Sequence, residues 1–521
     1  MVRTLSAALA LVLACGCAAT GAAAETARGR VYEDLNRNGV RDEGEPGIAG
    51  VGVSNGRLVV QTAEDGTYAL PVTNDTIIFV IKPRGWQPPV DELNIPRFYY
   101  IHKPEGSPAH LKYEGVAPTG PLPAAIDFPL HRQAEPDRFD VLLIGDTQPY
   151  TMQEVHYLAH DIVAPLIGVD AAFALSLGDL VGDDLSLFGP MSQTMAHLGM
   201  PLRYVRGNHD SDYEAHNDEQ SDDVFERHFG PPYYAFDYGP VHFIVLDDIV
   251  WHGRTEERKG YYEAGLGAAQ LEFLRNDLAL VPPERLVVLA MHIPIVEIAE
   301  RAELYQLLAG RPHTKSFSAH YHVHRHWFLD AAAGWPDATP HHHTTLTTTC
   351  GSWWRGAPDE VGLPHTTMRD GTPNGWCIAT FDGYTCTVRY RATRRPADYQ
   401  MNIHAPDAVT VTELGAAEVL VNVFAGSERS TVEMRVASGP WTRLELVARE
   451  DPYYAAIKEA EQSDAPPRGR PLPKAAVCSH LWAGRLPAEL PPGTHLIEVR
   501  TTDVYGQTYV GRRLIAVQPA G

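Results

Sequence analysis

The chain has 521 residues, and its 65 acidic and 43 basic side chains give a formal net charge of −22 at pH 7. This length exceeds that of one ordinary domain and predicts roughly two to four, and a hydrophobic fraction of 44% is sufficient for sizeable cores. The acidic balance excludes a protein that holds nucleic acid by general charge attraction, because phosphate polyanions are repelled, and it is compatible with bound cations.

The first residues have the pattern of a secretory signal peptide. Arg3 precedes the apolar run LSAALALVLA, which is too short to span a bilayer, and GAAAET has the small residues of a cleavage site. We therefore expect residues 1–24 to be removed and the protein to be exported, to the periplasm or outside the cell. A lipid anchor at Cys15 or Cys17 is the alternative, although Leu13 fits that processing poorly. No later segment has the length and apolarity of a transmembrane helix.

The cysteines outside this segment are compatible with disulfides, because export reaches an oxidising compartment. Four cysteines allow three pairings, among which the sequence does not choose. None has the spacing of zinc ligands, so no thiolate metal site is expected. These residues are Cys350, Cys377, Cys386 and Cys478.

Residues 25–135 are predicted to form a small β-sandwich, because apolar residues alternate between Gly and Asp turns. The start of this region also resembles the Ig-like repeat modules of bacterial surface proteins. Its segment DLNRNGVRDEGE has the ligand spacing of an EF-hand-type calcium loop, with glycine at the sharp turn. The flanks predict strands rather than helices, and a polar turn held by Asn and Asp side chains is the alternative. The possible calcium ligands are Asp34, Asn36, Asn38, Asp42 and Glu45.

Residues 136–395 change to an α/β pattern. Short apolar runs such as FDVLLIGD, AAFALSLGD and LVVLAMHIP alternate with helical stretches, of which GAAQLEFLRNDLALV is a good amphipathic helix. Residues 396–521 then return to strand-like alternation, as in EVLVNVFAG and GTHLIEVRTTDVYG, and predict a second β-sandwich. The segment DPYYAAIKEAEQSDAPPRGRPLP is a polar insertion within it.

Polar residues directly follow five of the apolar runs in the α/β region. Because functional loops of such folds meet at the strand ends, we expect these side chains to assemble one ligand site. Carboxylate, imidazole and amide groups from several loops are what a pair of divalent cations about 4 Å apart requires. The candidates are Asp146 and Gln148 in GDTQ, Asp179 in GDLVGD, Asn208 and His209 in GNHD, His292 in MHIP, and His320 and His322 in AHYH.

These five motifs, in this order over about half of the chain, resemble the calcineurin-like metallophosphoesterase family. Two positions differ from the common pattern: Gln148 stands where the family has histidine, and Ala319 where it has glycine. A glutamine occurs at the first position in a recognisable subfamily, but it replaces a nitrogen ligand by a weaker amide oxygen, which leaves the metal identity open. The flanking regions are similar to those of bacterial exported phosphoesterases with an N-terminal and a C-terminal sandwich.

The resemblance implies a multidomain fold, in which a central α/β four-layer sandwich lies between N-terminal and C-terminal β-sandwich domains. It also implies two divalent metal ions, Mn, Fe or Zn, at the strand ends. By this resemblance Asp179 bridges the metals, Asp146, His322 and Gln148 complete one site, and Asn208, His292 and His320 complete the other.

The same resemblance implies catalytic roles for two neighbours of Asn208. His209 is expected to contact the phosphate and, as imidazolium, to protonate the leaving oxygen rather than to bind metal. Asp210 is expected to orient His209, as carboxylates often do. Asp183 is close in sequence to Asp179, and no metal role is expected for it.

Other histidines have weaker signals. The run His341–His343 is expected at the rim of the site or in a structural role, although a histidine run can bind metal. His324 and His326 alternate with His322 along a possible strand and are interpreted as surface residues.

The function that this reading predicts is an exported phosphoesterase that hydrolyses small phosphate mono- or diesters, without a nucleic-acid partner. A non-catalytic surface or carbohydrate-binding protein that keeps the metal domain as a scaffold is the alternative, and a calcium-dependent adhesion module with incidental esterase activity is a third. The full set of ligand candidates argues against a scaffold, which has no chemical need for them. The substrate, the native metals and the oligomeric state stay open.

Overall fold

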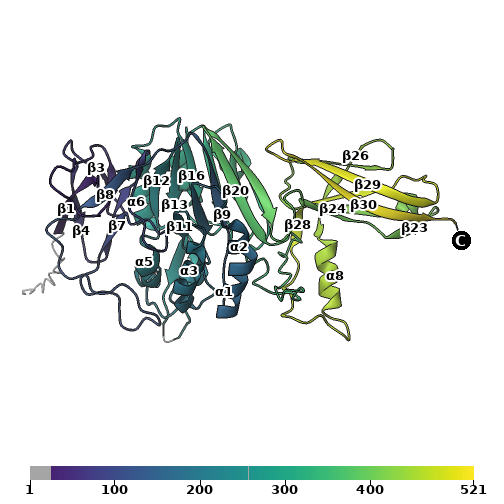
Figure 1. Ribbon diagram of the computed structural model, residues 1–521, viewed down its shortest axis with the longest axis horizontal. Helices are drawn as coiled ribbons and strands as arrows, with labels where there is room; N and C mark the ends of the chain where they lie inside the picture. Colours follow the sequence, from purple (N-terminus) through teal and green to yellow (C-terminus); the bar gives the residue numbers. More distant parts are fainter. Residues whose placement is uncertain (1–24, 256, 521) are drawn as a thin grey trace, which may run out of the picture.

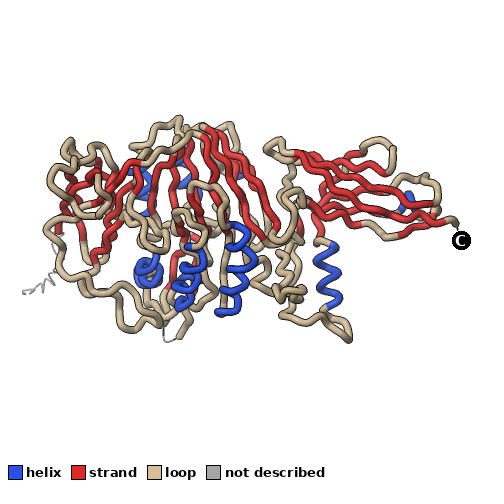
Figure 2. Tube along the Cα trace, in the orientation of Figure 1, coloured by secondary structure: helices blue, strands red, loops and turns tan. Residues whose placement is uncertain are grey.

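The computed structural model describes residues 25–255 and 257–520, and it contains three units along an elongated molecule (Figure 1). N-terminal strands lie at one end, a unit of mixed strands and helices in the middle, and C-terminal strands at the other end. Figure 2 shows the helices gathered in the central unit, with one further helix beside the C-terminal strands. The predicted signal segment lies outside the described residues.

The N-terminal unit is a β-sandwich whose two sheets share one apolar core that includes Val31, Leu70 and Val80. Its strands alternate between buried and exposed residues, as in β4, because one face of each sheet meets the core. One sheet has the order β4 (Thr67–Val72), β1 (Glu25–Glu33), β8 (Phe128–Arg132), β6 (Trp86–Gln87). The other has the order β3 (Val59–Gln61), β2 (Gly52–Ser54), β5 (Thr76–Ile81), β7 (Tyr99–His102).

The central unit contains two mixed sheets and a small hairpin. The five-stranded sheet has the order β11 (Leu202–Val205), β10 (Phe173–Leu177), β9 (Arg138–Ile144), β20 (Gly375–Asp382), β21 (Thr385–Ala392). The six-stranded sheet has the order β12 (Tyr234–Tyr238), β13 (Val241–Val245), β16 (Leu286–Ala290), β17 (Thr314–Ser318), β19 (His341–Thr345), β18 (Arg325–Leu329). The hairpin pairs β14 (Ile249–His252) with β15 (Tyr261–Ala264).

Helices cover the outer faces of these sheets, which gives four layers. In β9, Val141 and Leu143 point into a core shared with the six-stranded sheet, whereas Leu142 and Ile144 point into a second core with the first helices. Those helices are α1 (Met152–Leu158), α2 (Ala164–Leu166), α3 (Phe188–Ala196) and α5 (Asp223–Phe229). The short helix α4 (Asp218–Ser221) instead contacts β14, where Trp251 donates its backbone N–H to Asp218. Against the six-stranded sheet lie α6 (Gly267–Leu278) and α7 (Arg301–Leu308).

The C-terminal unit is the second predicted β-sandwich, with a core that includes Val421, Trp482 and Val499. One sheet has the order β22 (Met401–His404), β24 (Glu418–Val423), β28 (Val477–Arg485), β27 (Glu445–Glu450). The other has the order β23 (Ala408–Thr410), β30 (Thr508–Gln518), β29 (Gly493–Thr502), β25 (Thr431–Val436), β26 (Thr442–Arg443). The polar insertion begins as helix α8 (Pro452–Ala460), which Asp451 caps by accepting a hydrogen bond from the backbone N–H of Tyr454.

Both sandwiches contact the central unit through buried groups. Phe79 of β5 belongs to the central core, and Lys82 donates hydrogen bonds to Glu135 at 2.5 Å and to the Asp237 carbonyl at 2.6 Å. Phe424 of the C-terminal unit also packs into the central core. The N-terminal unit is therefore joined to the central one by the hydrogen bond from Lys82 to the Asp237 carbonyl as well as by apolar packing.

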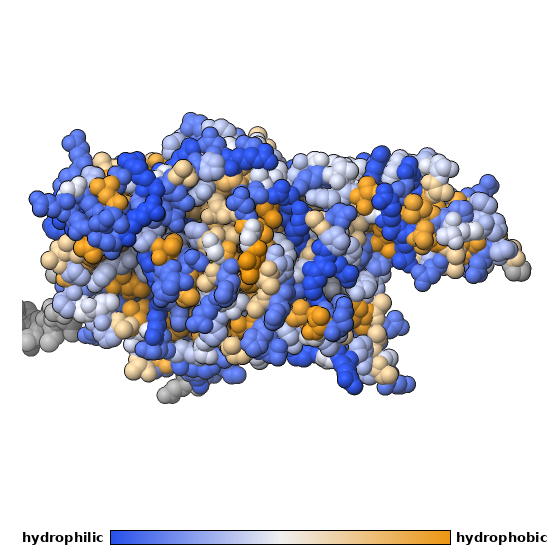
Figure 3. All heavy atoms as spheres, in the orientation of Figure 1, coloured by the Kyte–Doolittle hydropathy of each residue, from blue (hydrophilic) through white to orange (hydrophobic). Residues whose placement is uncertain are grey.

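Within the described residues, no helix is long and apolar enough to cross a membrane. The face of the molecule in Figure 3 is mostly hydrophilic, and its hydrophobic side chains form small separate areas.

Candidate active site

The five predicted motifs meet at one edge of the central sheets. Strands β9, β10 and β11 run parallel to one another, as do β16 and β17, so the loops that follow them emerge on the same side. The backbone N–H of Gln148 donates to the Asp179 carbonyl at 3.0 Å, and that of His320 donates to Asp146 Oδ1 at 3.3 Å. These bonds tie the loops after β9, β10 and β17 together.

The backbone of these loops adopts conformations that side chains rarely take. Asp146, Gln148, Asp179, His320 and His322 all have positive φ angles, between 33° and 67°. Such backbone angles cost free energy and occur where the surrounding structure demands one orientation of the side chain. The strain is concentrated on the predicted metal ligands.

Two glycines in the motifs are required by close approach. A Cβ atom on Gly207 would lie 2.1 Å from the backbone nitrogen of Asp179, and one on Gly178 would lie 2.5 Å from His292 Nδ1. Only glycine therefore lets the loops after β10 and β11 lie against each other and against the imidazole of His292. This explains the glycine that precedes Asp179 and the one that precedes Asn208.

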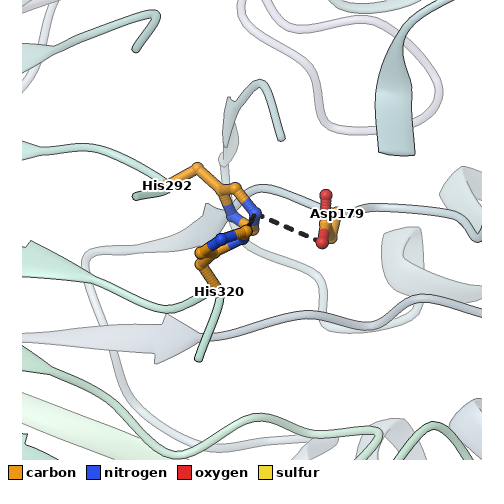
Figure 4. A group of neighbouring side chains, drawn as sticks. All are labelled: Asp179, His292 and His320. Carbon is orange, nitrogen blue, oxygen red and sulfur yellow. Dashed lines mark hydrogen bonds and ion pairs between the residues drawn. The ribbon is translucent and has the colours of Figure 1, made fainter. Parts of the chain in front are cut away.

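His292 points a ring nitrogen at three other predicted ligands. Its Nε2 is 3.1 Å from Asn208 Oδ1, 3.1 Å from His320 Nδ1 and 3.2 Å from Asp179 Oδ2. Its Nδ1 is 2.8 Å from the Leu177 carbonyl. Figure 4 shows the side chains of Asp179, His292 and His320 turned toward one another. Burial lowers the pKa of His292, but the carboxylates of Asp179 and Asp146 outweigh it and raise the pKa to about 10. The carboxylates around His292 therefore favour a positive charge at the centre of this ligand group.

A second group of acceptors lies around Asp146. Its Oδ2 atom is buried without a hydrogen-bond donor, and His322 Nε2 is 3.1 Å away. The Nδ1 atom of His322 is 2.5 Å from the Gly351 carbonyl, to which it donates, and burial lowers the pKa of His322 to about 4. The Nε2 lone pair of a neutral His322 therefore faces a carboxylate oxygen, which is an arrangement that a cation would satisfy.

Gln148 lies beside Asp179, but its amide nitrogen rather than its amide oxygen faces the ligand group. Its Nε2 atom is 3.4 Å from Asp179 Oδ2 and 3.3 Å from the Tyr150 hydroxyl, and its Oε1 is 3.7 Å from Cys350 Sγ. A half-turn of the amide exchanges the two atoms and would present the oxygen to the ligand group.

His209 lies beside this ligand group and is held by two carboxylates. Its backbone N–H donates to Asp179 Oδ1 at 2.9 Å, and its Nδ1 is 2.6 Å from Asp183 Oδ1. Burial lowers the pKa of His209, but Asp179 and Asp183 outweigh it and raise the pKa to about 9. The imidazolium form is favoured, with Nδ1–H bound to Asp183 and Nε2–H left to donate elsewhere.

The expectation that Asp210 orients the imidazole is wrong for this structure. Its carboxylate instead accepts the backbone N–H groups of Gly207 at 2.8 Å, Leu180 at 2.8 Å and Val181 at 3.2 Å. Asp210 turns back into the protein because these three amides have no other partner there, and it joins the loop after β10 to the loop after β11. Asp183, for which no metal role was expected, forms the hydrogen bond to Nδ1 of the His209 ring.

Three family models match the chain in sequence order. They are the N terminal of calcineurin-like phosphoesterase over residues 35–117, calcineurin-like phosphoesterase over residues 139–324, and the C terminal of calcineurin-like phosphoesterase over residues 343–509. The chain belongs to the calcineurin-like phosphoesterase family. The matched regions place an N-terminal and a C-terminal domain of that family around the central one.

Among solved structures, the chain is similar to purple acid phosphatase PPD1 from yellow lupin (Lupinus luteus) seeds, at 13% identity and a TM-score of 0.37. The match covers 70% of this chain and 66% of that one, which is less than two thirds of its length. CopC from Methylosinus trichosporium OB3b matches at 15% identity and a TM-score of 0.14, over 23% of this chain and 92% of that one. Superoxide reductase (Neelaredoxin) from Ignicoccus hospitalis matches at 13% identity and a TM-score of 0.13, over 23% and 81%. No curated protein matches the chain.

Aromatic residues that were not predicted as site residues surround the candidate active site. The ring of Trp353 stacks on His322 with centroids 3.9 Å apart, Tyr150 meets His209 edge to face, and Tyr262 meets His320 in the same way. Trp353 also has a positive φ of 58°. These rings restrict the orientation of the imidazoles, and no spacing rule in the sequence identifies them.

The remaining histidines predicted from the sequence have structural contacts, and all of them are buried except His342, which is partly buried. His341 and His343 in β19 bond the Ser316 hydroxyl at 2.6 and 2.7 Å. His324 and His326, interpreted as surface residues, are instead buried; their ring nitrogens lie 3.4 Å apart. The C-terminal unit covers them, since the Ala425 carbonyl is 3.3 Å from His326 Nε2.

No disulfide joins the four cysteines, so none of the three possible pairings is present. Cys350, Cys377 and Cys478 are buried, and Cys386 is partly buried.

In the predicted calcium loop, two acidic side chains accept hydrogen bonds from backbone amides of the loop itself. Asp34 accepts the backbone N–H groups of Asn38 at 3.2 Å and of Gly39 at 2.9 Å, and Glu45 accepts those of Leu35 at 2.9 Å and Asp42 at 3.0 Å. Over the described ranges, clusters of three His, Cys, Asp or Glu ligand atoms within 4.8 Å occur at Asp179, His292 and His320, and at Asp75, Asp223 and Glu226.

Proposed function

We propose that the protein hydrolyses small phosphate mono- or diesters at a site of two divalent metals, Mn, Fe or Zn, with His209 as the general acid. One metal would be held by Asp146, His322 and Gln148, the other by Asn208, His292 and His320, and Asp179 would bridge them. The observation that carries this proposal is the pair of acceptor groups, with the donorless Asp146 Oδ2 facing His322 on one side and His292 Nε2 facing two oxygens on the other.

The side chains divide the chemistry among them. Two cations at this site would neutralise the phosphoryl charge and activate a water. Leu177 and Gly351 accept the Nδ1–H groups of His292 and His322, which leaves each Nε2 for ligation. His209 donates a proton from Nε2 to the departing oxygen, while Asp183 holds its Nδ1–H and stabilises the imidazolium.

The direct test uses two chromogenic esters, p-nitrophenyl phosphate and bis(p-nitrophenyl) phosphate. We expect hydrolysis of one or both, its loss after chelation, and its return with Mn²⁺, Fe²⁺ or Zn²⁺. A scaffold that only binds carbohydrate or a surface would hold metal and release no p-nitrophenol with either ester. The ratio of the two rates then separates a monoesterase from a diesterase.

We also propose that the loop from Asp34 to Glu45 binds calcium through Asp34, Asn36, Asn38, Asp42 and Glu45. The supporting observation is the turn at Gly39, whose φ of 74° suits the sharp bend of such loops, and the placement of Asp34 and Glu45 at its two ends. Binding requires Glu45 to exchange the N–H groups of Leu35 and Asp42 for the ion.

Calcium is expected to raise the melting temperature of the N-terminal unit relative to EGTA. A ligand at one hundred times its Kd stabilises a fold by about 2.7 kcal/mol, and Glu45→Gln should remove the increase because it removes one charged ligand. Glu43→Gln, an exposed neighbour in the same loop, is the control and should keep it. Equal melting with calcium and with EGTA would show that the loop is a polar turn.

Export is a further part of the proposal, with residues 1–24 as the signal peptide and a lipid anchor at Cys15 or Cys17 as the alternative. The division proposed for the exported chain is a sandwich over 25–135, the catalytic domain over 136–395 and a second sandwich over 396–521. It is supported by the strands, since β8 ends at Arg132 before β9 begins at Arg138, and β21 ends at Ala392 before β22 begins at Met401.

A further inference from the structure

A cavity of about 700 Å³ lies between the N-terminal sandwich and the central unit, and no residue of the five motifs lines it. Its N-terminal wall includes the turns around Arg57 and Asp75, and its central wall includes helices α4 and α5 and the start of α6. Seven carboxylate side chains line it, and Arg57 is the one cationic side chain among the lining residues. The volume is that of a small-molecule site rather than of a single ion.

Most of these carboxylates already have a partner. Lys103 pairs with Asp75 at 2.8 Å, Arg206 with Asp247 at 2.9 Å, and Arg57 with Glu272 at 3.4 Å. The backbone N–H of Trp251 donates to Asp218 at 2.6 Å. The negative charge that is left without compensation therefore belongs mainly to other residues of the lining.

Those residues are Asp222 and Glu226. Burial raises the pKa of both carboxyl groups, that of Glu226 to about 8, and a cation in the cavity would lower both again. Both are more than nine-tenths buried, and Asp222 Oδ1 and Glu226 Oε2 have no hydrogen-bond partner. They are one helical turn apart at the start of α5, and the nearest cation to Glu226 Oε2 is Lys103 Nζ at 3.8 Å, beyond hydrogen-bond distance. Buried carboxylates without donors are costly, and a positive ligand in the cavity would remove that cost.

The surroundings indicate which kind of cation fits. The ammonium of Lys103 already lies among Asp75, Asp223 and Glu226, so an alkylammonium is the group that this part of the protein accommodates. Calcium and magnesium take six or more oxygen ligands, and zinc takes four ligands that usually include imidazole or thiolate, so two free carboxyl groups fall short of either kind of site. The cavity also has apolar walls, including Phe79 and Tyr233, which suit a hydrocarbon chain.

We propose that this cavity, defined by Asp222 and Glu226 on one wall and the turn at Asp75 on the other, binds an organic amine with two or more ammonium groups. One ammonium is held between Asp222 and Glu226, and the chain of the ligand lies along the apolar wall toward the N-terminal turn. The proposal does not depend on the phosphoesterase chemistry, because no predicted metal ligand lines the cavity.

Calorimetric titration of the full-length protein with spermidine tests it. One equivalent is expected to bind the unaltered protein. In the double variant Asp222→Asn/Glu226→Gln the Kd should rise at least about tenfold, since a charge-assisted hydrogen bond contributes that much. The control is Glu459→Gln/Glu489→Gln, which makes the same change in net charge at exposed positions of the C-terminal unit and should bind as the unaltered protein does.

Melting in the absence of ligand separates lost binding from lost folding. The double variant should melt at or above the temperature of the unaltered protein, because it removes two buried, mutually repelling carboxylates. Equal spermidine affinity in all three proteins would show attraction to the acidic surface only and overturn the proposal. Displacement of spermidine by an equal concentration of Ca²⁺ would also overturn it, because the cavity would then be a divalent-metal site.

Discussion

Asp179→Ala is expected to lose both metal ions and all measurable turnover. Its carboxylate lies 3.2 Å from His292 Nε2 and accepts the backbone N–H of His209, so it is the one side chain that contacts the proposed second metal site and the acid together. A bridging carboxylate serves both cations, and its removal also leaves the positive group at His292 without its main partner. Metal analysis by mass spectrometry and hydrolysis of p-nitrophenyl phosphate measure the two losses.

Asp398→Ala is the matched control for this variant, because Asp398 is exposed and lies in the linker after β21. It should keep the metal content and the rate of the unaltered protein. Retention of both metals by Asp179→Ala would contradict the bridging role, and the proposed division of ligands would then need another carboxylate at the centre.

His209→Ala should have the opposite pattern, with the metals kept and turnover reduced. General acid–base groups contribute about 10²- to 10⁴-fold, so a loss in that range is expected for an ester with a poor leaving group such as phenyl phosphate. The loss should shrink for p-nitrophenyl phosphate, because p-nitrophenolate departs with little protonation. Equal losses on the two esters, or a loss of metal as complete as in Asp179→Ala, would remove His209 from the role of acid.

Asp183→Asn extends this test to the residue that the structure adds. Asp183 Oδ1 is 2.6 Å from His209 Nδ1, and the Asp183 side chain has no such hydrogen bond to a predicted metal ligand. Its replacement should therefore keep the metals and cause a smaller loss of rate than His209→Ala, with the same dependence on the leaving group. Asp210→Asn should differ, because Asp210 joins backbone amides and acts on the fold of the loops. Asp210→Asn is expected to lower the melting temperature and to reduce the rate of hydrolysis by the same factor on both esters.

The convergence of the motif loops was predictable because it follows from strand direction. An apolar run followed directly by Asp, Asn or His places that residue at a strand end, and parallel strands bring those ends together. The comparisons confirm the family that the five motifs indicated, and the sheets confirm the two flanking sandwiches that strand-like alternation predicted. What the motifs do not contain is the direction of each side chain within its loop.

Asp183 and Asp210 illustrate that limit. Both are close to His209 in sequence or in the fold, and either carboxylate is chemically able to hold its ring. The choice depends on the positive φ of 68° at Asp183 and on three backbone amides that face Asp210, and neither appears in a residue pattern. Backbone hydrogen bonding between loops decided the outcome.

His324 and His326 were misread for a different reason. Alternation along a strand predicts that they share a face but not what covers that face. The cover comes from far along the chain: Asp370 accepts the backbone N–H of His324 at 2.7 Å, and His480 is 3.1 Å from the same carboxylate. These contacts span more than forty residues, and His480 belongs to the C-terminal unit, so they lie beyond local periodicity.

The metal content of the active protein tests the central claim most directly. Chelated protein should be inactive, and stepwise return of Mn²⁺, Fe²⁺ or Zn²⁺, measured as metal bound per chain beside the rate of p-nitrophenyl phosphate or bis(p-nitrophenyl) phosphate hydrolysis, should reach full activity at two equivalents. Calcium in the N-terminal loop is counted separately in the Glu45→Gln variant. Full activity with one equivalent, or activity that survives complete removal of metal, would contradict a two-metal phosphoesterase.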